Sequence, residues 1–207
     1  MSLVHGEGVR TLEEHGEAPG RSLGWWGMIF FIASEALIFA NLIAAYLYLE
    51  IRNGTWKLPT DIVFPLINTF ILLGSSIPAR FAGAAITQGN QRNLKIGLTL
   101  TILMGAIFLG GQAYEYTNLF GMHFTPQCTG CNSPVFGSSF FTLTGFHGLH
   151  VTVGLIFLVI VLLRALRGNF TAKKHFAVQA GEMYWHFVDG VWVFVFSTVY
   201  LLPLIRG

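Results

Sequence analysis

The chain has 207 residues, of which 53% are hydrophobic and only 11% are charged, and its formal net charge is +2. A soluble domain normally carries a larger charged fraction. The small net charge gives no reason to expect a nucleic acid or an acidic macromolecule as a partner. The composition therefore indicates an integral membrane protein.

Five apolar runs are each long enough to cross about 30 Å of hydrocarbon, which takes roughly 20 helical residues. They predict an all-α integral membrane protein, a bundle of five transmembrane helices in one domain, residues 24–207, after a flexible N-terminal arm, residues 1–23. The chain shows no obvious internal repeat. The predicted spans are Gly24–Leu49, Ile62–Ile86, Ile96–Tyr116, Ser138–Leu163 and Met183–Ile205.

Basic residues concentrate in the loops after the second and fourth predicted spans. Cytoplasmic loops carry an excess of Lys and Arg, so this asymmetry predicts an N-terminus inside and a C-terminus outside. The loops after the first and third spans together offer only Arg52 and Lys57. The basic residues on the predicted inner side are Arg80, Arg92, Lys95, Arg164, Arg167, Lys173 and Lys174.

The first span contains one acid in an apolar setting, Glu35. At ~1.5 Å per residue from Gly24, this side chain lies ~16 Å deep, near the middle of the membrane. An acid at that depth is costly and needs a partner or a proton. It is either a neutral carboxyl that bonds a neighbouring helix or a group that exchanges protons or contacts lipid. Trp25 and Trp26, at the start of this span, suit the membrane interface.

The second and third spans carry features that we interpret as helix packing. The small residues at Gly74–Ser76 allow close approach of helices, and Asn68 is expected to bond across helices. Gln112 and Glu115, three residues apart, are expected to do the same near the outer surface. Arg80 lies near the inner end of its span, where its side chain can extend toward lipid phosphate.

Cys128 and Cys131 are the only cysteines, and they lie in the predicted outer loop within PQCTGCNSP. On the oxidising side of the membrane we expect them to form a short structural disulfide. A single C-x-x-C without further ligands is weak evidence for zinc, and no thioredoxin-like pattern surrounds it.

Ionisable side chains recur within the last two spans. His147 and His150 are three residues apart on one face of the fourth span, and such groups usually face protein. Glu182, His186 and Asp189 form one stripe at i, i+4 and i+7 in the fifth. Pairing across helices, a metal or a proton relay would each account for this stripe. The Glu-x-x-His pairs of di-metal bundles are missing from the chain, so we expect no metal or redox cofactor.

Depth separates these side chains into two groups. His147 and His150 come out ~12–17 Å below the outer end of their span, and His186 and Asp189 ~5–9 Å above the inner end of theirs. The offset argues against a single site. Glu35 matches His150 in depth, and we therefore predict a contact between these two residues.

Five segments of the chain resemble subunit III of the haem-copper terminal oxidases, in particular cytochrome c oxidase subunit III. They fall in order and cover the chain from about residue 24 to its end. They are GMIFFIASEALIF around Glu35, INTFILLGSS at Ile67–Ser76, QAYEY at Gln112–Tyr116, FGSSFF with TGFHGLHV at Phe136–Val151, and YWHFVDGVW at Tyr184–Trp192.

The resemblance implies a supporting subunit that binds no redox metal. In that family, subunit I carries the haems and catalytic copper, and subunit III packs against it, holds phospholipids and helps to sustain proton uptake. Subunit I is the expected main partner, subunit II a further one and subunit IV an additional candidate, in a bacterial cytoplasmic membrane. The expected complex reduces oxygen to water and pumps protons.

The resemblance also assigns residues. Glu35 matches the family's buried carboxylate, His147 and His150 its histidine pair, and His186 and Asp189 its WHFVD motif. Arg164 matches an arginine near lipid headgroups. Together with the interfacial Trp25, Trp26 and Arg80 noted above, it completes the set of lipid-binding candidates.

The chain departs from the family in two respects. Longer members have two further N-terminal helices, which line one wall of a lipid cleft. Members also often carry an acid seven residues before the WHFVD histidine, where this chain has Gln179.

Other functions stay open. Quinol-oxidising relatives tend to have Asp at the Glu35 position and FWHFLD in place of YWHFVD, which favours cytochrome c as the donor and leaves a quinol oxidase as the alternative. A free-standing carrier or a metal-dependent membrane enzyme is a more remote alternative. The chain shows neither the repeated halves nor the broken helices of transporters.

Overall fold

The computed structural model describes residues 22–54, 56, 61–127 and 134–206, and all regular secondary structure in these ranges is helical. Five helices within them are long and apolar enough to cross a membrane, the fifth running through Phe176–Ile205. The predicted fold class, an all-α protein with five membrane spans, is confirmed. The elements are α1 (Leu23–Asn53), α2 (Val63–Thr87), α3 (Gln91–Gly121), α4 (Pro134–Leu166), α5 (Phe176–Phe196), the π-helical turn η1 (Ser197–Leu201) and α6 (Leu202–Arg206).

Most of the helices extend beyond the predicted spans. The prediction followed the apolar runs, whereas a helix continues into polar sequence wherever its backbone hydrogen bonds are still made. α3 begins at Gln91 instead of Ile96, because the Asn90 side chain accepts a hydrogen bond from the Asn93 backbone N–H at 3.1 Å and so caps the first turn. α5 begins at Phe176, seven residues before the predicted start.

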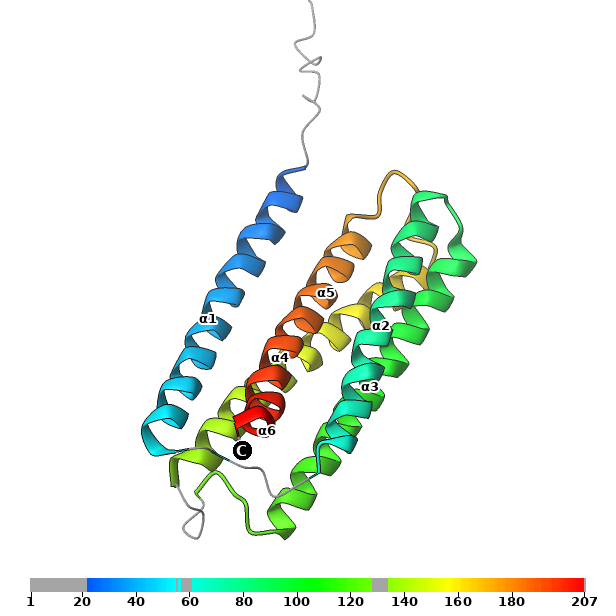
Figure 1. Cartoon of the computed structure of the whole chain (residues 1–207). Coiled ribbons are helices and arrows are strands. Elements are labelled where there is room, and N and C mark those ends of the chain that lie inside the picture. Colours follow the sequence, from blue (N-terminus) through cyan, green and yellow to red (C-terminus); the bar gives the residue numbers. More distant parts are fainter. Residues whose placement is uncertain (1–21, 55, 57–60, 128–133, 207) are drawn as a thin grey trace, which may run out of the picture.

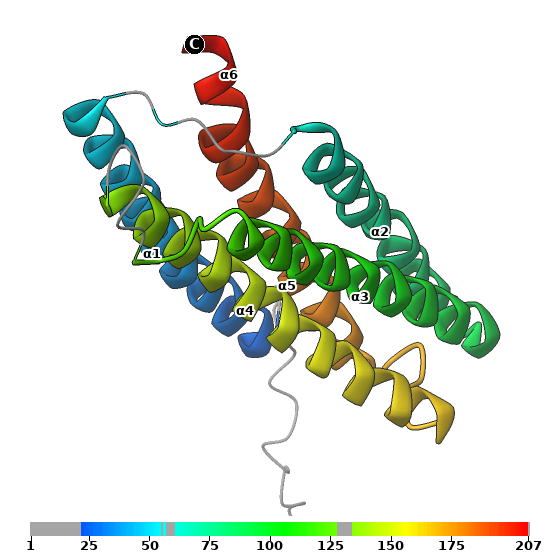
Figure 2. The same cartoon turned by 90° about the horizontal axis from the view of Figure 1, so that it is seen from below.

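The arrangement centres on α5, which lies between α1 and α2 with α3 and α4 on its other side (Figures 1 and 2). α1 packs against α4 and α5, α2 against α3 and α5, and α3 against α4. The start of α1 and the ends of α2 and α4 lie at one end of the bundle, and the C-terminus lies at the other (Figure 1). Which end faces the cytoplasm remains a prediction.

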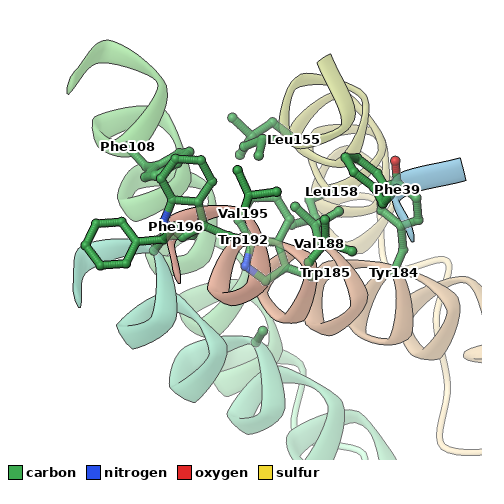
Figure 3. Close-up of a cluster of buried hydrophobic side chains, with 14 of the residues drawn as sticks. Phe39, Phe108, Leu155, Leu158, Tyr184, Trp185, Val188, Trp192, Val195 and Phe196 are labelled. Carbon is green, nitrogen blue, oxygen red and sulfur yellow. The ribbon is translucent and has the colours of Figure 1, made fainter. Parts of the chain in front are cut away.

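Two tryptophans of α5 fill the centre of the bundle (Figure 3). Trp185 and Trp192 are almost completely buried. The Trp185 indole N–H donates to Ser75 Oγ at 2.8 Å, and that of Trp192 donates to Thr69 Oγ1 at 2.9 Å. Both acceptors belong to α2, so these bonds position α5 against α2. A Cβ on Gly105 of α3 would lie 2.6 Å from the Trp185 ring, so glycine makes room for this ring.

Candidate functional site

Glu35 and His150 form a hydrogen-bonded pair between α1 and α4. Glu35 Oε2 lies 3.0 Å from His150 Nε2, which confirms the predicted contact. His150 Nδ1 lies 2.8 Å from the Phe146 carbonyl oxygen. A carbonyl can only accept, so Nδ1–H is the donor there. One further proton is therefore shared between Nε2 and the carboxyl group, which makes the pair a place that can hold or transfer a single proton.

The Glu35–His150 pair lies close to the surface of the bundle. The side chain of Glu35 is 19% exposed and that of His150 is 11% exposed. The hydroxyl of Tyr184 on α5 donates to the backbone carbonyl of His150 at 3.3 Å, and the Phe39 ring covers the imidazole at a centroid distance of 4.8 Å. The pair is consequently held by three helices but is still reachable from one side.

His147 occupies a different environment from His150, although both face protein as expected. It is fully buried, and neither ring nitrogen has a hydrogen-bond partner among the described residues. The centroid of its ring lies 4.8 Å from that of Trp192 and farther from those of two phenylalanines, 6.1 Å from Phe108 and 6.2 Å from Phe39. His147 thus belongs to the aromatic core, apart from the Glu35–His150 pair.

A second polar group joins α2 to α5, and we call it the α2–α5 cluster: Ser76, Glu182, His186 and Asp189. The Ser76 hydroxyl donates to Asp189 Oδ2 and lies 2.9 Å from His186 Nδ1. Because its single proton is committed to the carboxylate, the hydroxyl accepts from His186 Nδ1–H. Glu182 Oε1 lies 3.7 Å from His186 Nε2, which is too far for a hydrogen bond.

The predicted depths of His186 and Asp189 are wrong. They were counted from Met183, whereas α5 begins at Phe176, so His186 lies ~15 Å and Asp189 ~20 Å along the helix from its start. The two groups of ionisable side chains are separate because they lie at different helix interfaces. The Glu35–His150 pair joins α1 and α4, whereas the α2–α5 cluster lies at another helix interface.

The predicted lipid-binding side chains lie toward one end of the bundle, where α1 starts and α2 and α4 end (Figure 1). Trp26, Arg80 and Arg164 are exposed, and Trp25 is half-buried. The Arg164 guanidinium lies 5.5 Å from the centroid of the Phe170 ring. This placement fits an interfacial role, and lipid contact itself remains a prediction. Cys128 and Cys131 lie outside the described residues.

Sequence reasoning missed two features: the hydrogen bonds of Ser76 in the α2–α5 cluster and the burial of Glu50. Ser76 was grouped with the small residues of α2, because a serine in a helix gives no sign of a partner on another helix. Glu50 is 1% exposed and lies one residue beyond the predicted end of the first span. The expected cross-helix bonds of Asn68 and Glu115 are confirmed. Asn68 Nδ2 donates to the Phe108 carbonyl at 3.0 Å, and the Tyr200 hydroxyl donates to Glu115 Oε1 at 2.9 Å.

The donor side chains of the described ranges do not form a metal-binding arrangement. No three His, Cys, Asp or Glu residues in these ranges are grouped so that they could hold an ion. In the α2–α5 cluster, Glu182 and Asp189 approach His186 from different sides, on Nε2 and on the Nδ1 side through Ser76. The expected lack of a redox centre in this chain remains a prediction.

Comparison with known proteins agrees with the resemblance seen in the sequence. The family model of cytochrome c oxidase subunit III matches residues 11–203. A cytochrome c oxidase subunit 3 of Corynebacterium diphtheriae is 41% identical over 182 residues, 85% of this chain and 86% of that protein. One of Thermostichus vulcanus is 38% identical over 180 residues, 85% of this chain and 86% of that protein. One of Rattus norvegicus is 39% identical over 186 residues, 84% of this chain and 68% of that protein.

Proposed function

Because the chain belongs to the cytochrome c oxidase subunit III family, we propose that it is the non-redox accessory subunit of an aerobic respiratory oxygen reductase. In this role it stabilises subunit I, binds phospholipid and sustains proton uptake, while the complex reduces oxygen to water and pumps protons. The reaction with oxygen belongs to the haem and copper of the partner subunits. The work of this chain lies in its buried proton-bearing groups and in its surface, within a bacterial cytoplasmic membrane.

The observation that carries this proposal is the Glu35–His150 pair. A carboxyl and an imidazole 3.0 Å apart share one proton, and partial exposure lets that proton exchange with a neighbouring molecule. Ionisable groups within a membrane are costly and are kept mainly where they function. A pair that stores one proton near the surface of the bundle suits a subunit that supports proton uptake by its partner.

Cytochrome c is the proposed electron donor. The relatives quoted above carry the name cytochrome c oxidase, and Glu35 stands where quinol-oxidising relatives tend to have Asp. A purified complex that oxidises reduced cytochrome c supports this choice. One that oxidises only a quinol points to the alternative donor and leaves the subunit III role intact.

Substitution of Glu35 tests the proton-bearing role. Glu35→Gln keeps the size of the side chain but removes the acid. The complex should keep its haem content and its initial rate, and it should lose activity several-fold faster during sustained turnover, with fewer protons pumped per electron. Ser34→Ala is the matched control, because the Ser34 hydroxyl is exposed and donates to the Phe31 carbonyl of its own helix. Equal decay of the two variants would remove Glu35 from the proposal.

Purification of the tagged chain from its native membrane tests the accessory role as a whole. Haem absorption bands and copper should accompany the chain in mild detergent and should disappear when the chain is separated from its partners. A chain that emerges alone, or that retains a stoichiometric metal of its own, would contradict the proposed function.

A further inference from the structure

A cavity of about 360 Å³ opens at the end of the bundle where α2 starts and α3 ends. Its described lining includes three polar side chains, Asp61, Glu115 and Asn118, and the exposed rings of Phe64 and Tyr114. The centroids of these two rings are 5.4 Å apart. The cavity lies at the opposite end from the lipid-binding candidates described above (Figure 1), and sequence reasoning did not assign it.

Glu115 presents a reachable carboxyl oxygen to this cavity, although the residue as a whole is only 5% exposed. The Tyr200 hydroxyl donates to Oε1 at 2.9 Å, the one hydrogen bond of this carboxyl group within the described ranges. Oε2 is not among the unbonded polar atoms that are sealed inside the bundle, so it opens into the cavity that Glu115 lines. A carboxylate oxygen accepts hydrogen bonds, and this one is positioned for a ligand that donates one.

The charges around the cavity favour an organic cation. Asp61 is exposed and adds a second carboxyl group. The described lining contains no Lys, Arg or His, and the ion pairs within the described ranges involve neither Asp61 nor Glu115. No three His, Cys, Asp or Glu side chains of these ranges are grouped to hold a metal ion. An ammonium group, with one positive charge and several N–H donors, matches two carboxylates.

The cavity lies at the depth of lipid headgroups. The 31 residues of α3 extend ~46 Å, about the thickness of a bilayer together with its two headgroup layers. Glu115 lies ~9 Å before the last residue of α3, Gly121, at 1.5 Å per residue. Asp61 precedes Val63, the first residue of α2. Both carboxyl groups are therefore close to the boundary between hydrocarbon and headgroups.

An apolar stripe on α3 leads from the cavity toward the middle of the membrane. Leu103, Ile107 and Tyr114 are exposed, and their spacing places them on one face of the helix. An acyl chain can lie along this stripe while its headgroup occupies the cavity. A lipid with a cationic group in its head satisfies both the carboxylates and the apolar side chains.

We propose that this cavity binds the headgroup of a phospholipid that carries a primary amine. The ammonium group donates to Glu115 Oε2 and to the Asp61 carboxylate, and Tyr200 is a positioning residue that holds Glu115 by its other oxygen. The inference rests on the proposed function, which includes phospholipid binding, and it adds a site and a headgroup class.

Photolabelling of the intact complex tests the headgroup class without any substitution. The purified complex is reconstituted into phosphatidylcholine vesicles that contain either phosphatidylethanolamine or phosphatidylglycerol with the same diazirine-bearing acyl chain. Mass spectrometry should locate several-fold more adducts of the ethanolamine lipid than of the glycerol lipid on the α3 stripe. Labelling of the exposed face of α1 is the internal reference for non-selective contact. Equal labelling of the α3 stripe by the two lipids would overturn the proposal.

Removal of the carboxyl groups gives a second measurement. Glu115→Gln keeps an oxygen for the Tyr200 hydroxyl but removes the charge, and Asp61→Asn removes the charge at an exposed position. Each substitution should lower labelling of the α3 stripe by the ethanolamine lipid several-fold. Glu182→Gln is the matched control and should keep full labelling, because its carboxyl group belongs to the α2–α5 cluster.

Unchanged labelling in both Glu115→Gln and Asp61→Asn would contradict the lipid site. A carbodiimide crosslink from Glu115 to a lysine of another subunit would replace the lipid by a protein partner and would also contradict it. If the tagged chain purifies without haem, the proposed function fails instead, and the same labelling of the chain still decides the lipid site.

Discussion

Trp185 and Trp192 each place an indole ring in the centre of the bundle, and each indole N–H donates to a hydroxyl of α2. Large aromatic rings contribute much of the packing energy of a core, and their polar groups need partners when buried. Ser75 and Thr69 provide these partners. At this scale a small hydroxyl on one helix determines how a tryptophan of another can be buried.

Removal of the Ser75 hydroxyl should therefore destabilise the bundle. Ser75→Ala leaves the Trp185 N–H without its acceptor in an apolar interior, at a cost of about 1 kcal/mol. Equilibrium unfolding in mixed detergent micelles measures the difference. Ser34→Ala removes an exposed hydroxyl and should leave stability unchanged, so equal stabilities of the two variants would show that the Trp185 bond contributes nothing.

Single-residue contacts were predictable only where a position was unusual. Glu35 could be matched to His150 because an acid and a histidine at similar depth in apolar helices are rare and costly. Ser76 gave no such signal, because serine is common in membrane helices and often bonds the backbone of its own helix. The orientation of His147 toward Trp192 depends on how three helices pack together, which no single stretch of sequence contains.

At the scale of elements, the bundle depends on positions where helices approach closely. Gly105 of α3 faces the Trp185 ring of α5, and a Cβ there would lie 2.6 Å from the ring and 2.8 Å from Leu155. Gly97 of the same helix faces the Pro78 backbone carbonyl of α2, 2.7 Å from its built Cβ. α3 can therefore pack against its neighbours only with glycine at these two positions.

The substitution Gly105→Ala tests this requirement. The added methyl group should force the Trp185 ring or α3 to shift and should cost roughly 1–3 kcal/mol, the usual effect of overpacking a core. Gly110→Ala on the same helix is the control, because its built Cβ meets nothing within 4 Å. Unfolding in mixed micelles should rank Gly105→Ala well below Gly110→Ala. A Gly105→Ala variant as stable as the control would show that the contact is easily relieved.

The five spans could be predicted because each is an apolar run long enough to cross a membrane. Their ends could not, because an apolar run marks the part of a helix that lies in hydrocarbon and says little about the turns beyond it. The early start of α5 shows the consequence. Seven residues before Met183 are helical, so the predicted distances of His186 and Asp189 from the start of their helix were too short.

For the whole molecule, the basic residues predict which end of the bundle faces the cytoplasm. Cysteine labelling in intact cells tests this orientation, with Cys128 and Cys131 replaced by serine. Met122→Cys, at the exposed end of α3, should react with a membrane-impermeant maleimide, and Gln88→Cys, between α2 and α3, should react only after the cells are opened. The reverse pattern would invert the topology.

α1 is less buried in the bundle than the other four spans, and this has a mechanical consequence. Little of α1 is buried inside the bundle, and its apolar run, Gly24–Leu49, extends ~39 Å, well beyond the roughly 30 Å of hydrocarbon. A helix that is too long for the layer adapts by tilting, and the tilt changes with the thickness of the bilayer. Because the Glu35–His150 hydrogen bond links α1 to α4, a change in this tilt strains the bond. The thickness of the surrounding membrane therefore affects the geometry of a proton-bearing pair.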